Sequence, residues 1–223
     1  MNKDIIRRLI QVLVILVIQL FLVFIAAGTF KLVWVFAFMA CSFLILVINF
    51  IVVPLDVIKE RGSKKKNVKK WDKIISGINA APSLGLYIVS GLDLRFEWTG
   101  AISRWIHVLG LILLFSSSML FTWSMVSNSF FSTMVRIQDD RNHTVASKGP
   151  YKYVRHPGYV AFILMSISTP LVFGSIYALI CSLMTMILMI IRTNLEDKTL
   201  QKELDGYGAY TLQVKYKLIP YLW

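Results

Sequence analysis

The stretch Leu9–Gly28, LIQVLVILVIQLFLVFIAAG, decides the fold class, because it carries no charged side chain and is apolar apart from Gln11 and Gln19. A helix needs roughly 20 apolar residues to cross about 30 Å of hydrocarbon at about 1.5 Å per residue. The stretch is too long for the apolar part of a signal peptide and has no small-residue cleavage site. We therefore expect it to cross a membrane as a helix.

The composition of the whole chain agrees with a membrane protein. Of its 223 residues 57% are apolar and 16% are charged, whereas soluble domains carry about 45–50% apolar and about 25% charged residues. Soluble globular, disordered and fibrous classes are thereby disfavoured. The net charge of +12 then indicates basic loops against anionic lipid headgroups, not a nucleic-acid partner. Cys41 and Cys181 lie in apolar runs, where they form neither a disulfide framework nor a metal site.

Three further uncharged stretches predict spanning helices, at Val33–Leu55, Ile74–Leu92 and Trp105–Ser127. The middle one is the least apolar, because it contains several Gly, Ser, Asn and Pro residues. Small and polar residues of this kind let helices approach closely inside a bundle. We expect this span to pack against protein more than against lipid.

The last uncharged stretch, Pro157–Ile191, is too long for one span. As a single helix it would measure ~52 Å, well beyond the thickness of a bilayer core. Turn-forming residues lie near its middle, at Pro170, Gly174 and Ser175. The sequence therefore predicts a helical hairpin over residues 157–191, with short arms. We therefore expect the whole chain to be an all-α integral membrane protein, with about four spanning helices followed by this hairpin.

The basic residues predict the orientation of the helices. With an even number of crossings, 21 of the 24 Lys and Arg residues lie on the same side as both termini. Only Lys31, Arg95 and Arg104 fall on the other side. By the positive-inside rule both termini are then cytoplasmic, in the cell membrane of a prokaryote or the endoplasmic reticulum of a eukaryote. We interpret the basic segment Lys59–Lys73 as a topology signal that contacts lipid headgroups, in preference to a site for an acidic partner.

Two polar stretches flank the hairpin, at residues 132–156 and 192–217, so the hairpin should bring them together at the membrane surface. In the first, Arg155-His156-Pro157 stands at the mouth of a helix, with Pro in its favoured first-turn position. The alternative for this element is an interfacial anchor. In the second, Arg192 and Glu196 lie four residues apart on one helix face, where the alternative is a simple salt bridge. The tail from Tyr207 to Trp223, rich in Tyr, is expected to lie at the membrane interface.

These motifs, taken together, resemble a known family. His143-Thr144-Val145, Gly149-Pro150-Tyr151, Arg155-His156-Pro157-Gly158-Tyr159, an uncharged hairpin and Arg192-x-x-x-Glu196-Asp197 are similar to the isoprenylcysteine carboxyl methyltransferases, especially their prokaryotic branch, and to the superfamily that includes phospholipid N-methyltransferases. The resemblance covers residues 132–223. It predicts a division into N-terminal transmembrane helices with the basic loop 56–73 (residues 1–131) and a methyltransferase core (residues 132–223).

The resemblance implies an S-adenosylmethionine-dependent methyltransferase that needs no metal. The cofactor would be bound by two groups of residues and one carboxylate: His143, Thr144, Val145, Ala146 and Tyr151; His156, Pro157, Gly158 and Tyr159; and Glu196. Arg192 would face the methyl acceptor. The family pattern also suggests Gln138 as a cofactor contact, although its spacing to His143 differs.

The residues offer suitable chemistry for this reaction. Tyr151 and Tyr159 present aromatic faces to a ring or a cation, and Glu196 can accept hydrogen bonds from hydroxyl or ammonium groups. A carboxylate acceptor is already ionised near neutral pH and needs no general base, so Arg192 would position it through a two-point contact. An amine acceptor would have to lose a proton, and His156 would be the candidate base.

Several functions remain open at the level of sequence. The expected one is carboxyl O-methylation of an isoprenylcysteine-like or other lipophilic acceptor that enters from the bilayer. The alternatives are N-methylation of a phospholipid, S-methylation of a small thiol, a reductase related to the sterol reductases, and a membrane protein of this fold without enzymatic activity. Uncharged spans disfavour an ion-coupled transporter, and the chain contains no P-loop, dinucleotide-binding or metalloprotease motif.

Overall fold

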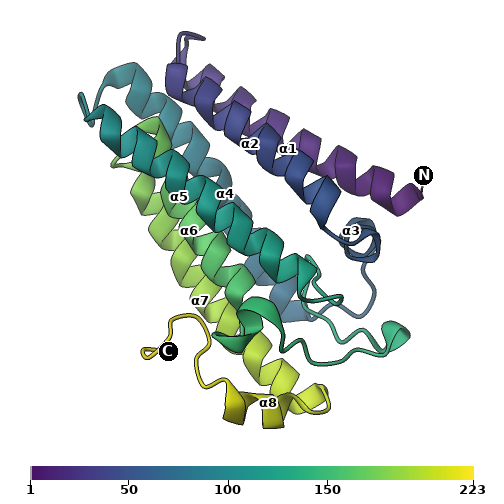
Figure 1. Cartoon of the computed structure of the whole chain (residues 1–223). Coiled ribbons are helices and arrows are strands. Elements are labelled where there is room, and N and C mark those ends of the chain that lie inside the picture. The colour runs from purple at the N-terminus through teal and green to yellow at the C-terminus, as the bar shows by residue number, and fades with distance from the viewer. Residues whose placement is uncertain (1) are drawn as a thin grey trace.

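The computed structural model describes residues 2–223 and is built from helices packed side by side (Figure 1). No β-strand occurs in this range. The helices are α1 (Lys3–Ala27), α2 (Val33–Val52), α3 (Leu55–Gly62), α4 (Lys70–Phe96), α5 (Arg104–Val126), α6 (Pro157–Phe173), α7 (Ala178–Glu203) and α8 (Tyr207–Gln213), with short 3-10 turns η1 (Asp139–Arg141) and η2 (Gly149–Lys152). The chain is thus an all-α integral membrane protein.

The predicted spans are confirmed as helices. The four predicted spans correspond to α1, α2, α4 and α5. These helices and α7, the second arm of the hairpin, are long and apolar enough to cross a bilayer. Large apolar side chains on α1 and α2 point outward, among them Val17, Phe21 and Ile51, as expected of surfaces that face lipid. The short helix α3 was not predicted, because it lies within the polar stretch after α2 and its eight residues show no long apolar run.

The hairpin is confirmed, with its turn at Gly174 and Ser175. Pro170 does not belong to the turn. It lies in the last turn of α6, where its carbonyl accepts hydrogen bonds from the backbone N–H groups of Gly174 and Ser175. The arms are unequal: α6 has 17 residues, whereas α7 has 26 and continues beyond the apolar stretch as a polar extension. At ~25 Å, α6 is the shortest of the bundle helices.

The core of the bundle is apolar and lies towards the end that carries the α1–α2 and α6–α7 turns. Phe38 of α2, Tyr87 of α4 and Phe173 of α6 pack their rings together. Helix α4 packs against α1 and α7, while α5 packs against α6. At Gly91 of α4 a side chain would come within 2.6 Å of Ala26 on α1, so this glycine permits the close approach expected of the third span. Cys41 and Cys181 are unpaired and pack against the same core.

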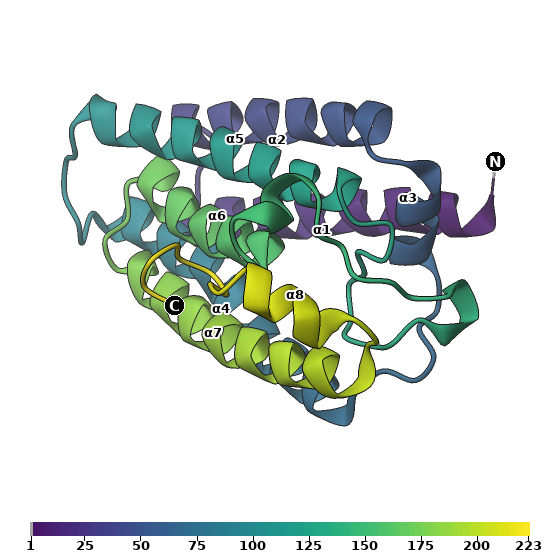
Figure 2. The ribbon, with the colours of Figure 1, turned by 60° about the horizontal axis from the view of Figure 1, so that its bottom comes forward.

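The helices alternate in direction, and the connections sort into two ends. At one end, the α1–α2, α4–α5 and α6–α7 turns meet: Trp34 stacks on His107, and Trp98 contacts Tyr177. The other end holds α3, the long α5–α6 connection, the polar part of α7, and α8, which lies against α7 (Figure 2). Helix α1 begins and α7 ends at the second end, which also holds most of the Lys and Arg residues. The even number of crossings stays a prediction.

Candidate functional site

One cavity of about 520 Å³ lies at the basic end of the bundle. One part of its wall comes from the α5–α6 connection, including residues 130–136 and 143–146. The rest comes from the starts of α6 and α8, the polar part of α7 and apolar residues such as Phe121 and Phe162. The volume falls within the range of about 300–1,000 Å³ that is usual for small-molecule sites. The two polar stretches that flank the hairpin therefore meet, as predicted, around one cavity.

The connection before α6 is held in shape by Gln138, whose side chain is buried. Its Nε2 donates to the carbonyl of Phe130 at 2.6 Å, and its Oε1 accepts from Arg141 at 2.8 Å. Both ends of the amide are thus occupied by the loop itself. Gln138 lines the cavity, but these contacts make it a residue that shapes the wall.

His143 follows on the same wall, with its ring packed against Phe130 at 4.5 Å between centroids. Its Nδ1 accepts a hydrogen bond from the backbone N–H of Gln138, so the neutral ring carries its proton on Nε2. Burial, reinforced by the charge of Arg136 and Arg141, lowers the pKa of His143 to about 4. Near neutral pH it is therefore an uncharged hydrogen-bond donor at the cavity wall.

Tyr151 is buried under the turn that begins with Gly149. Its hydroxyl oxygen accepts from Asn128 at 3.3 Å, and its carbonyl accepts from the Tyr210 hydroxyl at 2.7 Å. Burial raises the pKa of Tyr151 above its ordinary value. Gly149 has φ +58°, and an added Cβ would lie 2.1 Å from Ser127 Oγ. The turn can therefore press against the end of α5 only with glycine at this position.

Arg155, the first residue of the Arg-His-Pro element, binds protein and not solvent. Its guanidinium forms a two-point contact with Asp197, at 2.7 and 3.0 Å, and donates to the carbonyls of Val214 and Lys215. The backbone N–H of Arg155 also donates to the Tyr216 carbonyl. The arginine thus ties the start of α6 to α7 and to the C-terminal segment.

His156 is buried and shares Asp197 with Arg155. Its Nε2 lies 3.2 Å from Asp197 Oδ1, and the Tyr207 hydroxyl donates to the same oxygen at 3.0 Å. The ring stacks on Tyr159 at 5.8 Å between centroids. Asp197 therefore orients His156, Arg155 and Tyr207 together, a structural role that the sequence had not assigned to it.

Tyr159 and Glu196 meet across the gap between α6 and α7. The Tyr159 hydroxyl donates a short hydrogen bond to Glu196 Oε2, while the guanidinium of Arg192 lies over the Tyr159 ring at 5.3 Å. The alternative of a simple Arg192–Glu196 salt bridge is not what forms, because each side chain has another partner. Arg192, Glu196 and Tyr159 all line the cavity.

The partner of Arg192 is Asp72, on the first turn of α4. Arg192 Nε donates to Asp72 Oδ1 at 2.7 Å and Nη2 to Oδ2 at 3.2 Å, and Nη2 also donates to the Thr133 carbonyl. Asp72 is fully buried, and its Oδ2 accepts from the backbone N–H of Val135. This carboxylate holds both Arg192 and the cavity wall in place.

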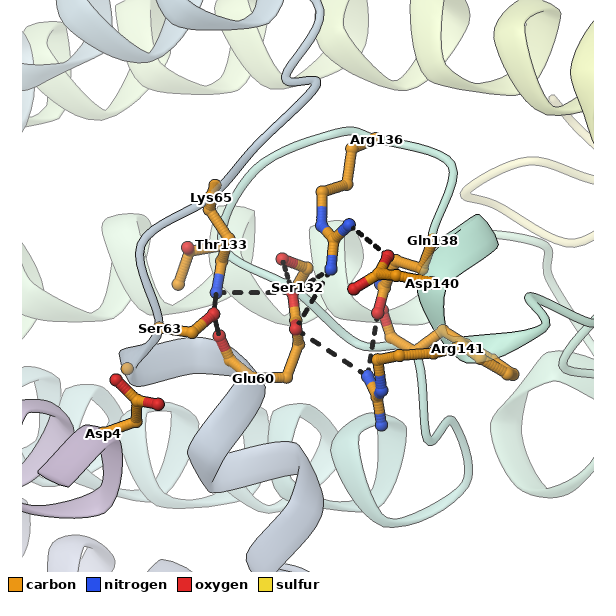
Figure 3. Close-up of polar contacts among 12 residues, drawn as sticks. Asp4, Glu60, Ser63, Lys65, Ser132, Thr133, Arg136, Gln138, Asp140 and Arg141 are labelled. Atoms are coloured by element: carbon orange, nitrogen blue, oxygen red, sulfur yellow. Dashed lines mark hydrogen bonds and ion pairs between the residues drawn. The ribbon is translucent and has the colours of Figure 1, made fainter. Parts of the chain in front are cut away.

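A second buried carboxylate, Glu60 of α3, fixes the same wall from the outside (Figure 3). It lies 3.3 Å from Lys65 and 3.2 Å from Arg136, with Arg141 at 3.9 Å, and it accepts from the Ser132 hydroxyl at 3.1 Å. Three cations thus converge on one anion. The segment 132–141 is clamped to α3, so the N-terminal part of the chain contributes to the shape of the cavity.

The structure gathers nearly all of the predicted site residues. His143, Thr144, Val145, Ala146, Tyr151, His156, Gly158, Tyr159, Arg192 and Glu196 line the one cavity. Pro157 does not line it. This proline is buried at the first position of α6, where its ring starts the helix.

Other contributors were missed by sequence reasoning, chiefly Asp72, Arg61, Asn128 and the segment 130–136. A signal existed for Asp72, since it is a lone acid within a basic run. Tyr207 and Tyr210 were assigned to the membrane interface, but both are buried in the protein and line the cavity. Their buried phenol groups satisfy Asp197 and the Tyr151 carbonyl, which explains why they point inward.

The donor set fits the cofactor that the motifs implied. S-adenosylmethionine combines an aromatic base, hydroxyls, an amino-acid end and a sulfonium cation. The cavity offers the aromatic rings of Tyr159, Phe130 and Phe131, the carboxylate of Glu196 and a neutral His143 donor. At Gly158 an added Cβ would lie 2.8 Å from the Phe131 ring, so the glycine keeps this aromatic wall close to the start of α6.

Comparison with known proteins points to the region of the chain that forms this cavity. Residues 108–202 match the family described as "Isoprenylcysteine carboxyl methyltransferase (ICMT) family". The uncharacterized protein YpbQ of Bacillus subtilis (strain 168) is 29% identical over 103 residues, which make up 45% of this chain and 58% of that protein. The alignment thus spans just over half of that relative. The family match confirms the resemblance drawn from the motifs, and it includes the α5–α6 connection, α6 and the Arg192–Glu196 face of α7.

Proposed function

We propose that this protein is a membrane methyltransferase that uses S-adenosylmethionine to methylate the carboxylate of a lipophilic acceptor, such as an isoprenylcysteine. The match of residues 108–202 to the isoprenylcysteine carboxyl methyltransferase family supports this proposal. The observation that carries the proposal is the Tyr159–Glu196–Arg192 group on the wall of one cavity. It joins an aromatic face, an anion for the cofactor and a cation for the acceptor.

The cofactor would be held by the connection before α6 and by the facing ends of α6 and α7. Glu196 has one oxygen engaged by Tyr159 and can accept from hydroxyl or ammonium groups with the other. Near neutral pH His143 can donate but carries no charge, so it does not repel a sulfonium. When bound, S-adenosylmethionine would supply an electrophilic methyl group: a carboxylate oxygen would bond to the methyl carbon as the carbon–sulfur bond breaks, which would give a methyl ester and S-adenosylhomocysteine.

Arg192 would position the acceptor. Asp72 and the Thr133 carbonyl hold its Nε and Nη2, so the guanidinium is fixed before the acceptor arrives, and a fixed donor loses little entropy on binding. An ionised carboxylate needs no base. The protein then contributes mainly alignment and exclusion of water. Apolar side chains on the wall of the larger cavity, Phe121, Phe162 and Met189, would help to keep water away from the reacting groups.

The orientation belongs to the same proposal. The end that holds the cavity carries most of the Lys and Arg residues, and the positive-inside rule places such an end in the cytoplasm. The N- and C-termini would then both be cytoplasmic. Cysteine labelling at Ser63 and Gly100, which lie at opposite ends of the bundle, would test the assignment with an impermeant reagent.

The decisive experiment is methyl transfer from labelled S-adenosylmethionine into membranes that contain the protein, followed by mild base. We expect volatile methanol, as released by a methyl ester. Label that survives base would contradict the carboxylate assignment and indicate an amine or thiol acceptor, for which His156 would be the first residue to change. A protein that binds no S-adenosylmethionine would refute the methyltransferase proposal as a whole.

Two substitutions test the assigned roles. Glu196→Ala should abolish cofactor binding, whereas Glu203→Ala, a partly exposed glutamate on the same helix that pairs with Lys69, should not. Arg192→Lys should retain cofactor binding and lose turnover, because an ammonium group cannot reproduce the two-point contact. Loss of both properties in Arg192→Lys would make this arginine a cofactor or structural residue.

A further inference from the structure

A second, smaller cavity of about 190 Å³ lies beside the first, between α1, α2, α3 and α5. Its wall is mostly apolar, with Val12, Ile45, Phe50 and Met125 among its residues. Two arginines, Arg8 and Arg61, interrupt this apolar wall. No residue assigned to cofactor binding lines it, so its chemistry has to be explained separately.

Arg61 stands at the junction of the two cavities, since it lines both of them. Its guanidinium lies over two aromatic rings, 5.3 Å from the centroid of Phe121 and 5.2 Å from that of Phe131. These rings meet edge to face at 88°. Such faces favour a cation, but they leave all of its N–H donors without an acceptor oxygen.

The other arginines at this end of the molecule are paired differently. Arg136 contacts Glu60, Arg155 contacts Asp197, and Arg192 contacts Asp72. Within residues 2–223, neither Arg61 nor Arg8 forms a hydrogen bond or ion pair through its side chain. Planar guanidinium groups in partly buried positions normally bind a carboxylate or a phosphate, so these two donors lack their usual counterpart.

Arg8 and Arg61 are brought together by the contact between α1 and α3. At Gly62, next to Arg61, an added Cβ would lie 2.0 Å from the Asp4 carbonyl and 2.9 Å from Arg8 Cβ. The two helices touch at this glycine, which fixes two like charges beside one small cavity. Burial, together with Arg8 and Arg192, lowers the pKa of Arg61 to about 9. An anion at this point would relieve the repulsion.

We propose that Arg61, assisted by Arg8, binds the anionic group of a single-chain amphiphile, whose hydrocarbon chain lies along the apolar wall of the smaller cavity. This inference rests on the proposed function in one respect: we identify the amphiphile with the carboxylate-bearing methyl acceptor. Because Arg61 lines both cavities, it would hold the carboxylate at the edge of the larger one. There Arg192 already has Asp72 as a partner. Specificity for a charged acceptor would reside in Arg61, outside the residues that match the family.

The test uses the full chain in nanodiscs of zwitterionic phosphatidylcholine, with laurate as the carboxylate probe and methyl laurate as its neutral counterpart. We expect laurate to bind more tightly than its ester by about tenfold or more, as an ion pair of this kind permits. Arg61→Gln should weaken laurate binding by a similar factor. Arg104→Gln is the matched control, because Arg104 also lies over an aromatic ring, Trp105, but at the opposite end.

Equal binding of laurate and methyl laurate by the unaltered protein would overturn the proposal, and this comparison does not depend on the folding of any variant. Unchanged laurate affinity in Arg61→Gln would overturn it as well. If anionic phosphatidylglycerol in the nanodisc displaces laurate, the ligand is a bilayer headgroup and the acceptor assignment fails. Absence of S-adenosylmethionine binding would refute the proposed function, whereas Arg61-dependent laurate binding would still establish the anion site.

Discussion

Arg192 and Asp72 form a two-point ion pair across 120 positions of sequence, with Nε 2.7 Å from Oδ1 and Nη2 3.2 Å from Oδ2. Asp72 is fully buried, and Arg192 is nearly so. The pair joins the start of α4 to the polar part of α7, so a residue outside the family match orients the residue that we assign to the acceptor.

We predict that Asp72→Asn lowers the free energy of unfolding by about 3–5 kcal/mol, because it leaves a buried guanidinium without its counter-charge. Turnover should fall more strongly than S-adenosylmethionine affinity, since Asp72 itself does not line the cavity. Thermal unfolding in detergent and parallel assays of binding and turnover would measure both effects.

The control for this substitution is Asp56→Asn. Asp56 also pairs with an arginine, Arg141, at 3.4 Å, but its side chain is 57% exposed. Exposed pairs contribute about 0–1 kcal/mol, so this variant should unfold close to the original temperature. If the two substitutions lowered the unfolding temperature equally, burial of the Asp72–Arg192 pair would contribute nothing to stability.

Arg155 gives a second prediction, because it links Asp197 to the C-terminal segment. Arg155→Lys keeps the charge but cannot contact Asp197, Val214 and Lys215 together. Loss of such charge-assisted hydrogen bonds should cost about 1.5–3 kcal/mol and release residues 214–223 to protease. Limited proteolysis followed by mass spectrometry would detect this, with Arg104→Lys as the exposed control. A protease-resistant tail in Arg155→Lys would contradict the assigned role.

Much of this fold could be predicted from sequence, because each spanning helix is encoded locally. A run such as Leu9–Gly28 needs no knowledge of its neighbours to be identified as a span. The hairpin was equally predictable from its length, although Pro170 was assigned to the turn. A proline near the end of a helix and a proline in a turn look the same in sequence, and only the Gly174 conformation distinguishes them here.

The site was predictable only where its motifs are local. His143–Ala146 and the residues His156, Gly158 and Tyr159 lie close together in sequence and reach the same cavity. Arg61 lines the cavity, and Asp72 and Glu60 fix its wall, only because α3 and α4 pack against distant segments. Their charges looked like parts of a solvated loop, since the sequence does not reveal which carboxylate a buried arginine will meet. The proposed division at residue 131 likewise stays a prediction, and ion pairs cross it.

Gly149 provides a prediction about backbone shape. Its φ of +58° and the 2.1 Å approach of an added Cβ to Ser127 Oγ mean that Gly149→Ala must distort the turn above Tyr151. We expect a loss of stability of about 1–3 kcal/mol and weaker cofactor binding. Gly208→Ala is the matched control, because Gly208 has open space around it and lies in α8. If both variants behave alike, the turn tolerates a side chain.

His143 yields a prediction about pH. Its pKa is about 4 in the folded protein, against an ordinary value of about 6.5. Between these values the unfolded chain binds more protons than the folded one, so the free energy of unfolding falls as the pH drops through this window. The contribution of the neutral ring is fully present above about pH 6.5 and is lost towards about pH 4. Thermal unfolding of the original protein and of His143→Gln across this range would isolate it. The difference between the two should change with pH in that window, and a constant difference would show that His143 is not buried in its neutral form.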